Sequence, residues 1–201
     1  LDAFPDHFFT AHGGIWQRVL THLVLSRRER ELWYSLRMPE PRRLEWLLGR
    51  VVAKDAVRQY LRQRYGLVLC PADIEVLPDG NGCPVAQGAW TDQVPCVPML
   101  SLSHTAGVAV AVAGDCDAGV GVGVDIEHMG RMNEDVEALA FTPQERELLS
   151  SVDDAEKDGW LLRLWCAKEA IAKALGQGMI GGPQALVVKA LDAGTGSVKV
   201  S

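Results

Sequence analysis

Two long helical segments constrain the fold more than any other feature of this chain. Apolar spacing predicts a helix over residues 42–65, which Gly66 ends, and a second helix over residues 160–175. Near its middle each helix carries a similar pattern, Ala-Lys-Asp-Ala-Val at 53–57 and Ala-Lys-Glu-Ala-Ile at 167–171. Because Ala, Lys and acidic residues all favour helices, this echo is compatible with a duplication of an α+β unit without establishing one.

Shorter signals complete an α+β pattern. Helix starts are predicted at Ser26, with Glu29 three residues later, and at Thr142, with Pro143 and then Glu145 three residues after the cap. Alternating apolar residues predict strands, including one over 119–127 and a closing hairpin. The predicted strands are 74–77, 99–103, 108–113, 119–127, 186–190 and 197–200. We expect two halves, residues 1–100 and 101–201.

Composition excludes several classes of protein. The 201 residues are 48% hydrophobic and 23% charged, which allows a real core and argues against disorder. The net charge of −6 argues against a generic nucleic-acid binder. Residues 1–66 hold 12 Lys and Arg against 7 Asp and Glu, whereas residues 67–201 hold 8 against 19. This division suggests a site where anions meet metal-binding carboxylates, and the alternative is charge scattered over solvated faces.

The cysteines and the start of the chain bear on location. The five cysteines are odd in number and scattered, with no CxxC pair, which argues against a disulfide framework or a structural zinc site. The chain shows no apolar segment led by Lys or Arg, and no apolar run of about 18 residues that could span a membrane. We therefore expect a protein of the reducing cytoplasm.

Two carboxylates alternate along the predicted strand at 119–127. On a strand Asp125 and Glu127 point to one face, while Val124 and Ile126 point into the core. Two carboxylates on one face can converge on a hard cation. The alternative is a pair of solvent-facing acids on an edge strand.

A mixed stripe lies on the second long helix. Trp165, Glu169 and Lys173 recur every four residues and share one face. This combination suits the wall of a pocket, where a carboxylate sits beside an anion-binding lysine. The alternative is a surface Glu–Lys pair beside a core tryptophan.

A third feature ends the strand at 99–103. Ser103, His104 and Thr105 stand there in sequence, and a histidine at a strand end suits a phosphate donor or, equally, a hydrogen-bonded turn. Ser103 and His104 could also suggest a serine hydrolase, but adjacent strand residues point opposite ways and no GxSxG elbow is present, which argues against it.

These three features, in this order, resemble the 4′-phosphopantetheinyl transferases. They read Ser-Leu-Ser-His-Thr at 101–105, Gly-Val-Asp-Ile-Glu at 123–127 and Trp-x-x-Lys-Glu-Ala-x-x-Lys at 165–173. The similarity runs from about residue 25 to residue 188 and fits the larger, pseudo-dimeric, surfactin-synthetase-activating type. The resemblance implies an α+β fold of two similar α/β halves with pseudo-twofold symmetry, each a small antiparallel sheet packed on a long helix.

The resemblance also implies a reaction and a metal site. The enzyme would move the phosphopantetheine arm of coenzyme A to a serine of an acyl or peptidyl carrier protein, releasing 3′,5′-ADP. Mg²⁺, or alternatively Mn²⁺, would be bound by Asp125, Glu127 and Glu169. Glu169, directly or through a metal-bound water, would take the serine proton, with Asp125 and Lys173 as the other catalytic residues.

Further residues match positions that bind coenzyme A in the family. The resemblance assigns phosphate contacts to His104, Lys168 and Lys173, beside Ser103. Arg43 is the nearest match to the basic residues of the first half that hold the 3′-phosphate in the family, with Arg28 and Arg50 as its neighbours. Cys83 and Pro84 match an adenine loop that commonly reads Gly-Lys-Pro or Gly-Arg-Pro, so Cys83 removes one basic contact.

The resemblance extends to partners. The arginine-rich first half would steer an acidic carrier protein, and one chain with both halves would act as a monomer. The stretch at 14–33 and the start at Leu1 resemble transferase domains fused to the C-terminus of iterative polyketide synthases, in which the carrier domain belongs to the same chain. The alternatives are a metal-dependent phosphohydrolase of coenzyme A or nucleotides, and an inactive docking domain for carrier proteins.

Overall fold

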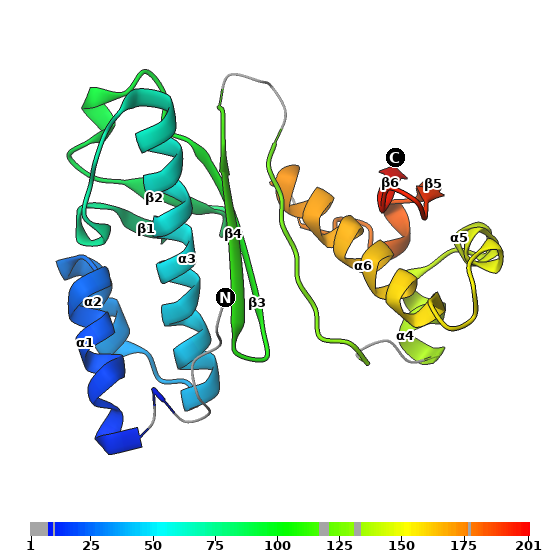
Figure 1. The fold of residues 1–201 in the computed structure, drawn as a ribbon, viewed down its shortest axis with the longest axis horizontal. Coiled ribbons are helices and arrows are strands. Elements are labelled where there is room, and N and C mark those ends of the chain that lie inside the picture. The colour runs from blue at the N-terminus through cyan, green and yellow to red at the C-terminus, as the bar shows by residue number, and fades with distance from the viewer. Residues whose placement is uncertain (1–7, 10, 117–120, 131–133, 177) are drawn as a thin grey trace.

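A computed structural model describes residues 8–9, 11–116, 121–130, 134–176 and 178–201. Helices and strands are mixed along the chain, which confirms the α+β class (Figure 1). No helix in these ranges is both long and apolar enough to cross a membrane. The helices are α1 (Ile15–Val24), α2 (Arg27–Ser35), α3 (Glu40–Tyr65), α4 (Glu134–Ala140), α5 (Pro143–Leu148) and α6 (Lys157–Ala174). The strands are β1 (Glu75–Pro78), β2 (Pro84–Gln87), β3 (Met99–Thr105), β4 (Val108–Gly114), β5 (Val188–Asp192) and β6 (Ser197–Val200).

The strands form three two-stranded antiparallel sheets, β1–β2, β3–β4 and β5–β6. The local signals that predicted the helix starts are present. Ser26 and Thr142 both cap their helices through complete capping boxes, and α3 ends at Gly66, whose φ of 68° is the left-handed conformation that glycine adopts freely. Thus the helix boundaries follow from short-range chemistry.

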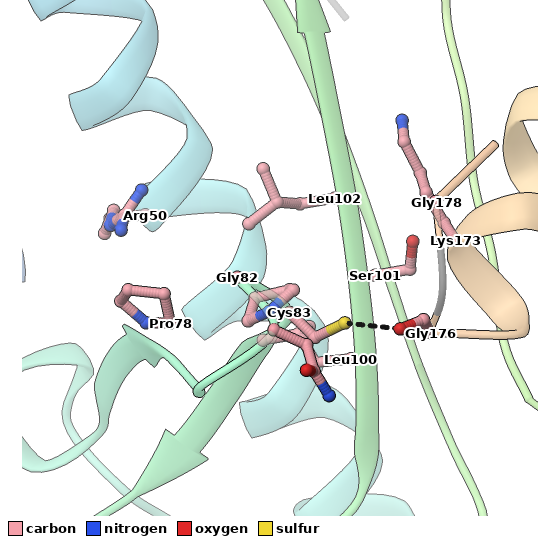
Figure 2. A pocket seen from close by; sticks show the side chains of 12 residues that line it. Arg50, Pro78, Gly82, Cys83, Leu100, Ser101, Leu102, Lys173, Gly176 and Gly178 are labelled. Carbon is pink, nitrogen blue, oxygen red and sulfur yellow. Dashed lines mark hydrogen bonds between the residues drawn. The ribbon is translucent and has the colours of Figure 1, made fainter. Parts of the chain in front are cut away.

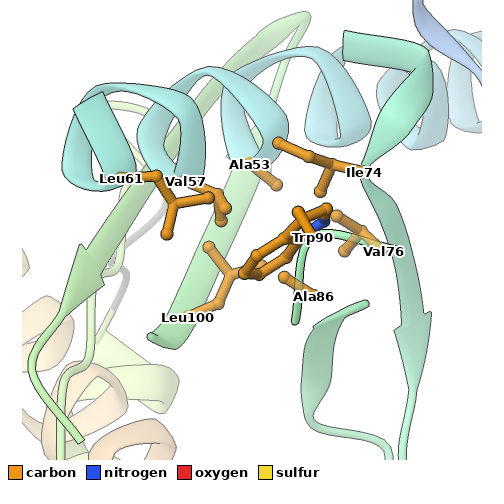
Figure 3. Packing of buried hydrophobic residues seen from close by; sticks show 8 residues of the cluster. All are labelled: Ala53, Val57, Leu61, Ile74, Val76, Ala86, Trp90 and Leu100. Carbon is orange, nitrogen blue, oxygen red and sulfur yellow. The ribbon is translucent and has the colours of Figure 1, made fainter. Parts of the chain in front are cut away.

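Two larger hydrophobic clusters organise the molecule. In the first, α3 packs through Ala53, Val57 and Leu61 against the fully buried Trp90 and against Leu100 of β3 (Figure 3). The second cluster lies between α6, α5 and the β5–β6 sheet and contains Phe141. Because β3 and β4 pack on α3, the strand bearing Ser103 and His104 belongs to the first cluster.

The predicted strand at 119–127 is wrong for the residues that the structure describes there. Residues 121–128 run extended between β3 and α6 but pair with no strand (Figure 1). The reason is their close approach to α6. A Cβ added to Gly121 or Gly123 would lie 1.8 Å from a carbonyl oxygen of α6, that of Ala174 or Ala170. Glycine therefore seats this segment on the helix, and residues 119–120 lie outside the described part of the chain.

Two cysteines are joined, contrary to the expectation from their scattered spacing. Cys96, before β3, and Cys116, after β4, form a disulfide with their Cα atoms 6.4 Å apart. Spacing along the chain did not reveal this pair because the β3–β4 hairpin brings its two ends together. Cys70, Cys83 and Cys166 are free thiols.

The most deeply buried charges form two closely similar ion pairs. In the first, the capping-box residue Glu29 binds Lys54 of α3, and both side chains are fully buried. Lys54 also donates to the carbonyl of Val24 (2.6 Å), and the amide of Val76 in β1 donates to Glu29 (3.0 Å).

The second pair repeats these contacts in the other half. Glu145, the capping-box residue of α5, binds Lys168 of α6 at 2.7 Å, and both side chains are fully buried. Lys168 also donates to the carbonyl of Ala140 (2.8 Å), and the amide of Val188 in β5 donates to Glu145 (2.7 Å). In each half the lysine therefore reaches the carbonyl two residues before the N-cap, and the glutamate also accepts from a strand amide.

The sequences around the two lysines agree with this equivalence. Residues 46–57 and 160–171 share Trp, Leu, Leu, Ala, Lys and Ala at six of twelve aligned positions. We call each set of contacts a capping frame: the first is Glu29 with Lys54, and the second is Glu145 with Lys168.

We predict that Glu145→Gln destabilises the protein in a pH-dependent way. Burial alone would raise the pKa of Glu145, but hydrogen bonds from Lys168, Val188 and Thr142 outweigh it and hold the pKa below its ordinary 4.5. The charged carboxylate therefore stabilises the fold fully above pH 4.5, and this contribution is lost as the pH falls through the lower, folded-state pKa. At pH 7 the variant leaves Lys168 buried without a counter-charge, at a cost of about 3–5 kcal/mol.

Urea unfolding at a series of pH values measures this effect. The gap in unfolding free energy between the wild type and Glu145→Gln should narrow as the solution is acidified below pH 4.5. A gap that stays constant down to pH 3 would contradict the assignment.

Candidate functional site

Asp125 is the centre of the candidate site. Its Oδ1 accepts from Lys173 Nζ of α6 at 2.6 Å and from Ser103 Oγ of β3 at 2.7 Å. Lys173 also donates to the carbonyl of Val124 at 3.1 Å. The Asp125 side chain is only 5% exposed, and its Oδ2 is buried without a hydrogen-bond partner among the described residues. A solvent-facing acid on an edge strand is therefore excluded at this position.

A row of hydroxyl groups on one face of β3 holds the segment that carries Asp125. Ser101 Oγ accepts from the amide of Val124 (3.1 Å), and Thr105 donates to Glu127 (3.4 Å). With Ser103 these residues alternate along β3, so they replace the missing strand pairing with side-chain contacts. Sequence reasoning used Ser103 alone, although the Ser-x-Ser-x-Thr alternation was visible.

A pocket of about 330 Å³ opens beside this centre. Figure 2 shows Arg50 of α3 and the β1–β2 turn on one side, with Lys173 and Gly176 on the other. The free thiol of Cys83 donates to the carbonyl oxygen of Gly176 at 3.9 Å and so links the two sides. The lining residues are Arg50, Pro78, Asn81, Gly82, Cys83, Pro84, Leu100, Ser101, Leu102, Lys173, Gly176 and Gly178.

The pocket therefore joins four predicted residues from distant parts of the chain, Arg50, Cys83, Pro84 and Lys173. Its walls are partly apolar, with leucine and proline side chains, and cationic groups stand at two sides. Such a pocket suits a ligand with an apolar ring and anionic groups.

The two predicted arginines of α3 have different surroundings. Arg50 stacks over Trp46 at 4.0 Å, and burial lowers its pKa to about 10 although Glu29 opposes the shift. Arg43 stacks over Trp33 at 4.3 Å and lies 3.3 Å from Glu40, in a different hollow beside α1. The structure thus places Arg50, and not Arg43, in the pocket next to Lys173.

His104 lies away from Asp125. Its Nδ1 is 3.5 Å from Glu45 of α3, and alternation along β3 puts it on the face opposite Ser103. The ring lies close to α3, since a Cβ at Gly49 would stand 3.8 Å from it, an ordinary van der Waals contact. His104 therefore borders α3 and not the carboxylate centre.

Lys168, to which the resemblance assigns a phosphate contact, lies in the interior of the protein. It is fully buried, and its ammonium contacts Glu145 and the carbonyls of Ala140 and Pro183. All of these partners are groups of the protein itself, and the phosphate contact stays a prediction. The sequence pattern could not reveal this burial, since Lys168 and Lys173 are both helical lysines close to Glu169.

The three predicted metal ligands have unequal surroundings. Asp125 is buried, Glu127 and Glu169 are half-buried, and the described part of the chain holds no group of three or more His, Cys, Asp or Glu side chains arranged to bind a metal ion. Cys166 of α6, which sequence reasoning did not select, lies beside this region. Burial raises the pKa of its thiol to about 12, with Asp125 and Glu127 contributing.

Comparison with known families gives one match. Residues 121–201 match the model of the 4′-phosphopantetheinyl transferase superfamily. The matched region begins at the segment seated on α6 and includes the second capping frame, Asp125 and Lys173. This part of the chain is therefore similar to a domain of that superfamily. No curated protein matches the chain significantly.

Replacing Gly123 tests how the segment is seated. The Cβ of a Gly123→Ala variant would meet the carbonyl oxygen of Ala170, and a backbone atom cannot move aside as a side chain can. We expect a loss of about 1–3 kcal/mol in unfolding free energy, as for other overpacked sites.

Gly159→Ala is the matched control on α6, because a Cβ there meets nothing within 4 Å. It should stabilise the helix by up to about 1 kcal/mol. Urea unfolding compares the two variants, and equal stability would show that the segment is not held against α6 as described.

Proposed function

We propose that this protein transfers the 4′-phosphopantetheine arm of coenzyme A to a serine hydroxyl of a carrier protein. The observation that carries the proposal is the pocket in which Lys173, bound to Asp125, faces Arg50 and the Cys83–Pro84 turn. Coenzyme A has an adenine ring, a pyrophosphate and a 3′-phosphate, and this pocket offers apolar walls between two cations. The superfamily match to residues 121–201 supports the same reaction class.

We assign Arg50 and Lys173 to the phosphates of coenzyme A. Arg50 is held in place by its stacking on Trp46, so little side-chain freedom is lost when it binds an anion. Lys173 stands at the edge of the pocket, and its side chain is 30% exposed. The Cys83–Pro84 turn packs beside the adenine ring, and the thiol supplies no charge there.

Mg²⁺ is the ion proposed for the carboxylate centre, although the three carboxylates are not gathered into a metal site in the described residues. Buried Oδ2 of Asp125 has no partner in the described residues, and a hard cation prefers such oxygen ligands. Asp125, Glu127 and Glu169 would hold the ion. When bound, the ion would supply positive charge that neutralises the pyrophosphate.

The reaction itself exchanges a phosphoanhydride bond of coenzyme A for a phosphoester bond to serine. The serine oxygen attacks the phosphorus that carries the pantetheine arm, the bond from that phosphorus to 3′,5′-ADP breaks, and Glu169 takes the serine proton. Lys173 stabilises the charge that grows on the departing phosphate. Asp125 holds Lys173 in place for this task.

The two capping frames support the pseudo-dimeric type, with halves at residues 1–100 and 101–201 related by a pseudo-twofold axis. Each frame joins a capping box, a long helix and a strand in the same way. We infer that one chain supplies both halves of the site and acts as a monomer. The stretch at 14–33 supports a place in a polyketide synthase, whose acidic carrier domain would be the substrate.

Glu169→Gln tests the proton acceptor. Incubation with coenzyme A, Mg²⁺ and an apo-carrier protein, followed by intact mass measurement, should show transfer at least about a hundredfold slower than in the wild type. Asp55→Asn is the matched control, since Asp55 holds the equivalent position in the first half but is exposed and bonds to Arg58 and Gln59. Its transfer rate should match the wild type.

The same assay separates the alternatives. A wild-type protein that cleaves coenzyme A without adding mass to the carrier would be a phosphohydrolase. One that binds the carrier but does neither would be a docking domain. Either result would overturn the transferase proposal.

Arg50→Met tests the assignment of the phosphate contacts. Methionine keeps an apolar stem over Trp46 but removes the charge, so the dissociation constant for coenzyme A should rise about ten- to a hundredfold. Arg43→Met should weaken binding much less, because Arg43 lies in the other hollow. Isothermal titration calorimetry measures both, and an equal loss in the two variants would contradict the assignment.

A further inference from the structure

We propose that Glu145 and Lys168 are a positioning pair that fixes the rotation of α6 and thereby places Glu169 and Lys173 against Asp125. This inference rests on the proposed function for the roles of those three residues. It assigns Lys168, which directly precedes Glu169 in the chain, to the support of the site and not to contact with the substrate.

The Glu145–Lys168 pair contacts α6 on the side opposite the segment that bears Asp125. Lys168 reaches Glu145 at the start of α5, Ala140 at the end of α4 and Pro183 beyond α6. At about 100° per residue, Ala170 and Ala174 lie on the opposite side of α6, and it is their carbonyls that Gly123 and Gly121 approach. The buried pair thus holds α6 from behind, while the segment bearing Asp125 lies across its front.

Several hydrogen bonds to Glu145 make the orientation of α6 rigid. Glu145 accepts from the amides of Thr142 (2.8 Å) and Val188 (2.7 Å) in addition to Lys168. One carboxylate therefore ties α5, α6 and β5 together, and the aromatic ring of Phe141 lies 4.8 Å from the Lys168 ammonium. A rotation of α6 would break several of these contacts at once, so one orientation of the helix is strongly favoured.

The first half of the chain provides a comparison. Lys54 makes the equivalent contacts and is equally buried, yet the residue after it, Asp55, is exposed and bonds only within α3 among the contacts described. Because Lys54 has these partners in a part of the chain without the carboxylate centre, its role is structural. The same geometry at Lys168 therefore indicates that Lys168 too is structural, and that it supports the position of the next residue, Glu169.

The experiment compares Lys168→Met, Glu145→Gln and the double variant in the full chain. It measures the dissociation constant for coenzyme A, the turnover number for carrier modification and the alkylation rate of Cys166. Cys166 is a half-buried thiol of α6 next to Asp125 and Glu127, so its alkylation, followed by peptide mass spectrometry, reports the orientation of the helix without any requirement for activity.

We expect each single variant to lower turnover about ten- to a hundredfold, as misplacement of catalytic groups by about 1 Å does. The dissociation constant for coenzyme A should change less than about threefold, and Cys166 should be alkylated several times faster. The double variant should be no worse than either single one, since it removes the whole pair and leaves no buried charge alone. Lys54→Met, the control in the first half, should lower stability but leave Cys166 alkylation unchanged.

Several results would overturn the proposal. A large loss of coenzyme A affinity in Lys168→Met but not in Glu145→Gln would make Lys168 a substrate contact. Unchanged turnover and unchanged Cys166 alkylation in a folded variant would show that the pair stabilises the fold but does not position α6. If the variants at either position do not fold, Lys168→Arg keeps the charge with a different shape and should show the same effects in weaker form.

The two proposals fail separately. A wild-type protein without transfer activity would overturn the proposed function, whereas the alkylation of Cys166 would still test the positioning of α6. Normal transfer in the wild type with no response of Cys166 to Lys168→Met or Glu145→Gln would overturn the positioning proposal alone.

Discussion

The buried pairing of a capping-box glutamate with a lysine is the interaction on which the rest of this structure depends. A helix start leaves amide groups without partners, and Glu29 and Glu145 satisfy such amides while also bonding to a strand and to a long helix. The glutamate that starts each helix thereby also makes a tertiary contact. Because a buried ion pair is worth having only when its remaining hydrogen bonds are satisfied, these additional partners explain why charges persist in the core.

The two frames hold different chemistry on similar scaffolds. Four residues before Lys54, α3 presents Arg50 to the pocket, whereas the equivalent position of α6 is the fully buried Leu164. After the lysine, α6 carries Glu169 where α3 carries Asp55. The excess of basic residues in the first 66 positions and of acidic residues beyond them agrees with this division, since one half supplies the cation Arg50 and the other supplies the carboxylates. The proposed site would therefore draw on both parts of the chain.

The sequence predicted what short-range chemistry decides. The caps at Ser26 and Thr142 and the end of α3 at Gly66 depend on neighbouring residues, and they lie where they were expected. The segment at 121–128 was misjudged because its alternation is that of a strand, while its partner is the backbone of α6, which only the tertiary structure supplies. The burial of Lys168 could not be predicted for a related reason: residue type alone does not separate a buried lysine from an exposed one on the same helix. Arg43 and Arg50 could not be separated either, since they lie seven residues apart on one face of the same helix and both stack on tryptophan.

The contact between Lys173 and Asp125 is compatible with phosphate binding and does not compete with it. A lysine ammonium has three donors, and the contacts described use two of them, to Asp125 Oδ1 and to the carbonyl of Val124. The third donor belongs to a side chain that lines the pocket. Asp125 is in a similar position, with Oδ1 bonded to Lys173 and Ser103 and Oδ2 without a partner in the described residues. Each member of the pair thus holds the other in place with part of its bonding capacity, and the rest is available to the ligand proposed for this pocket.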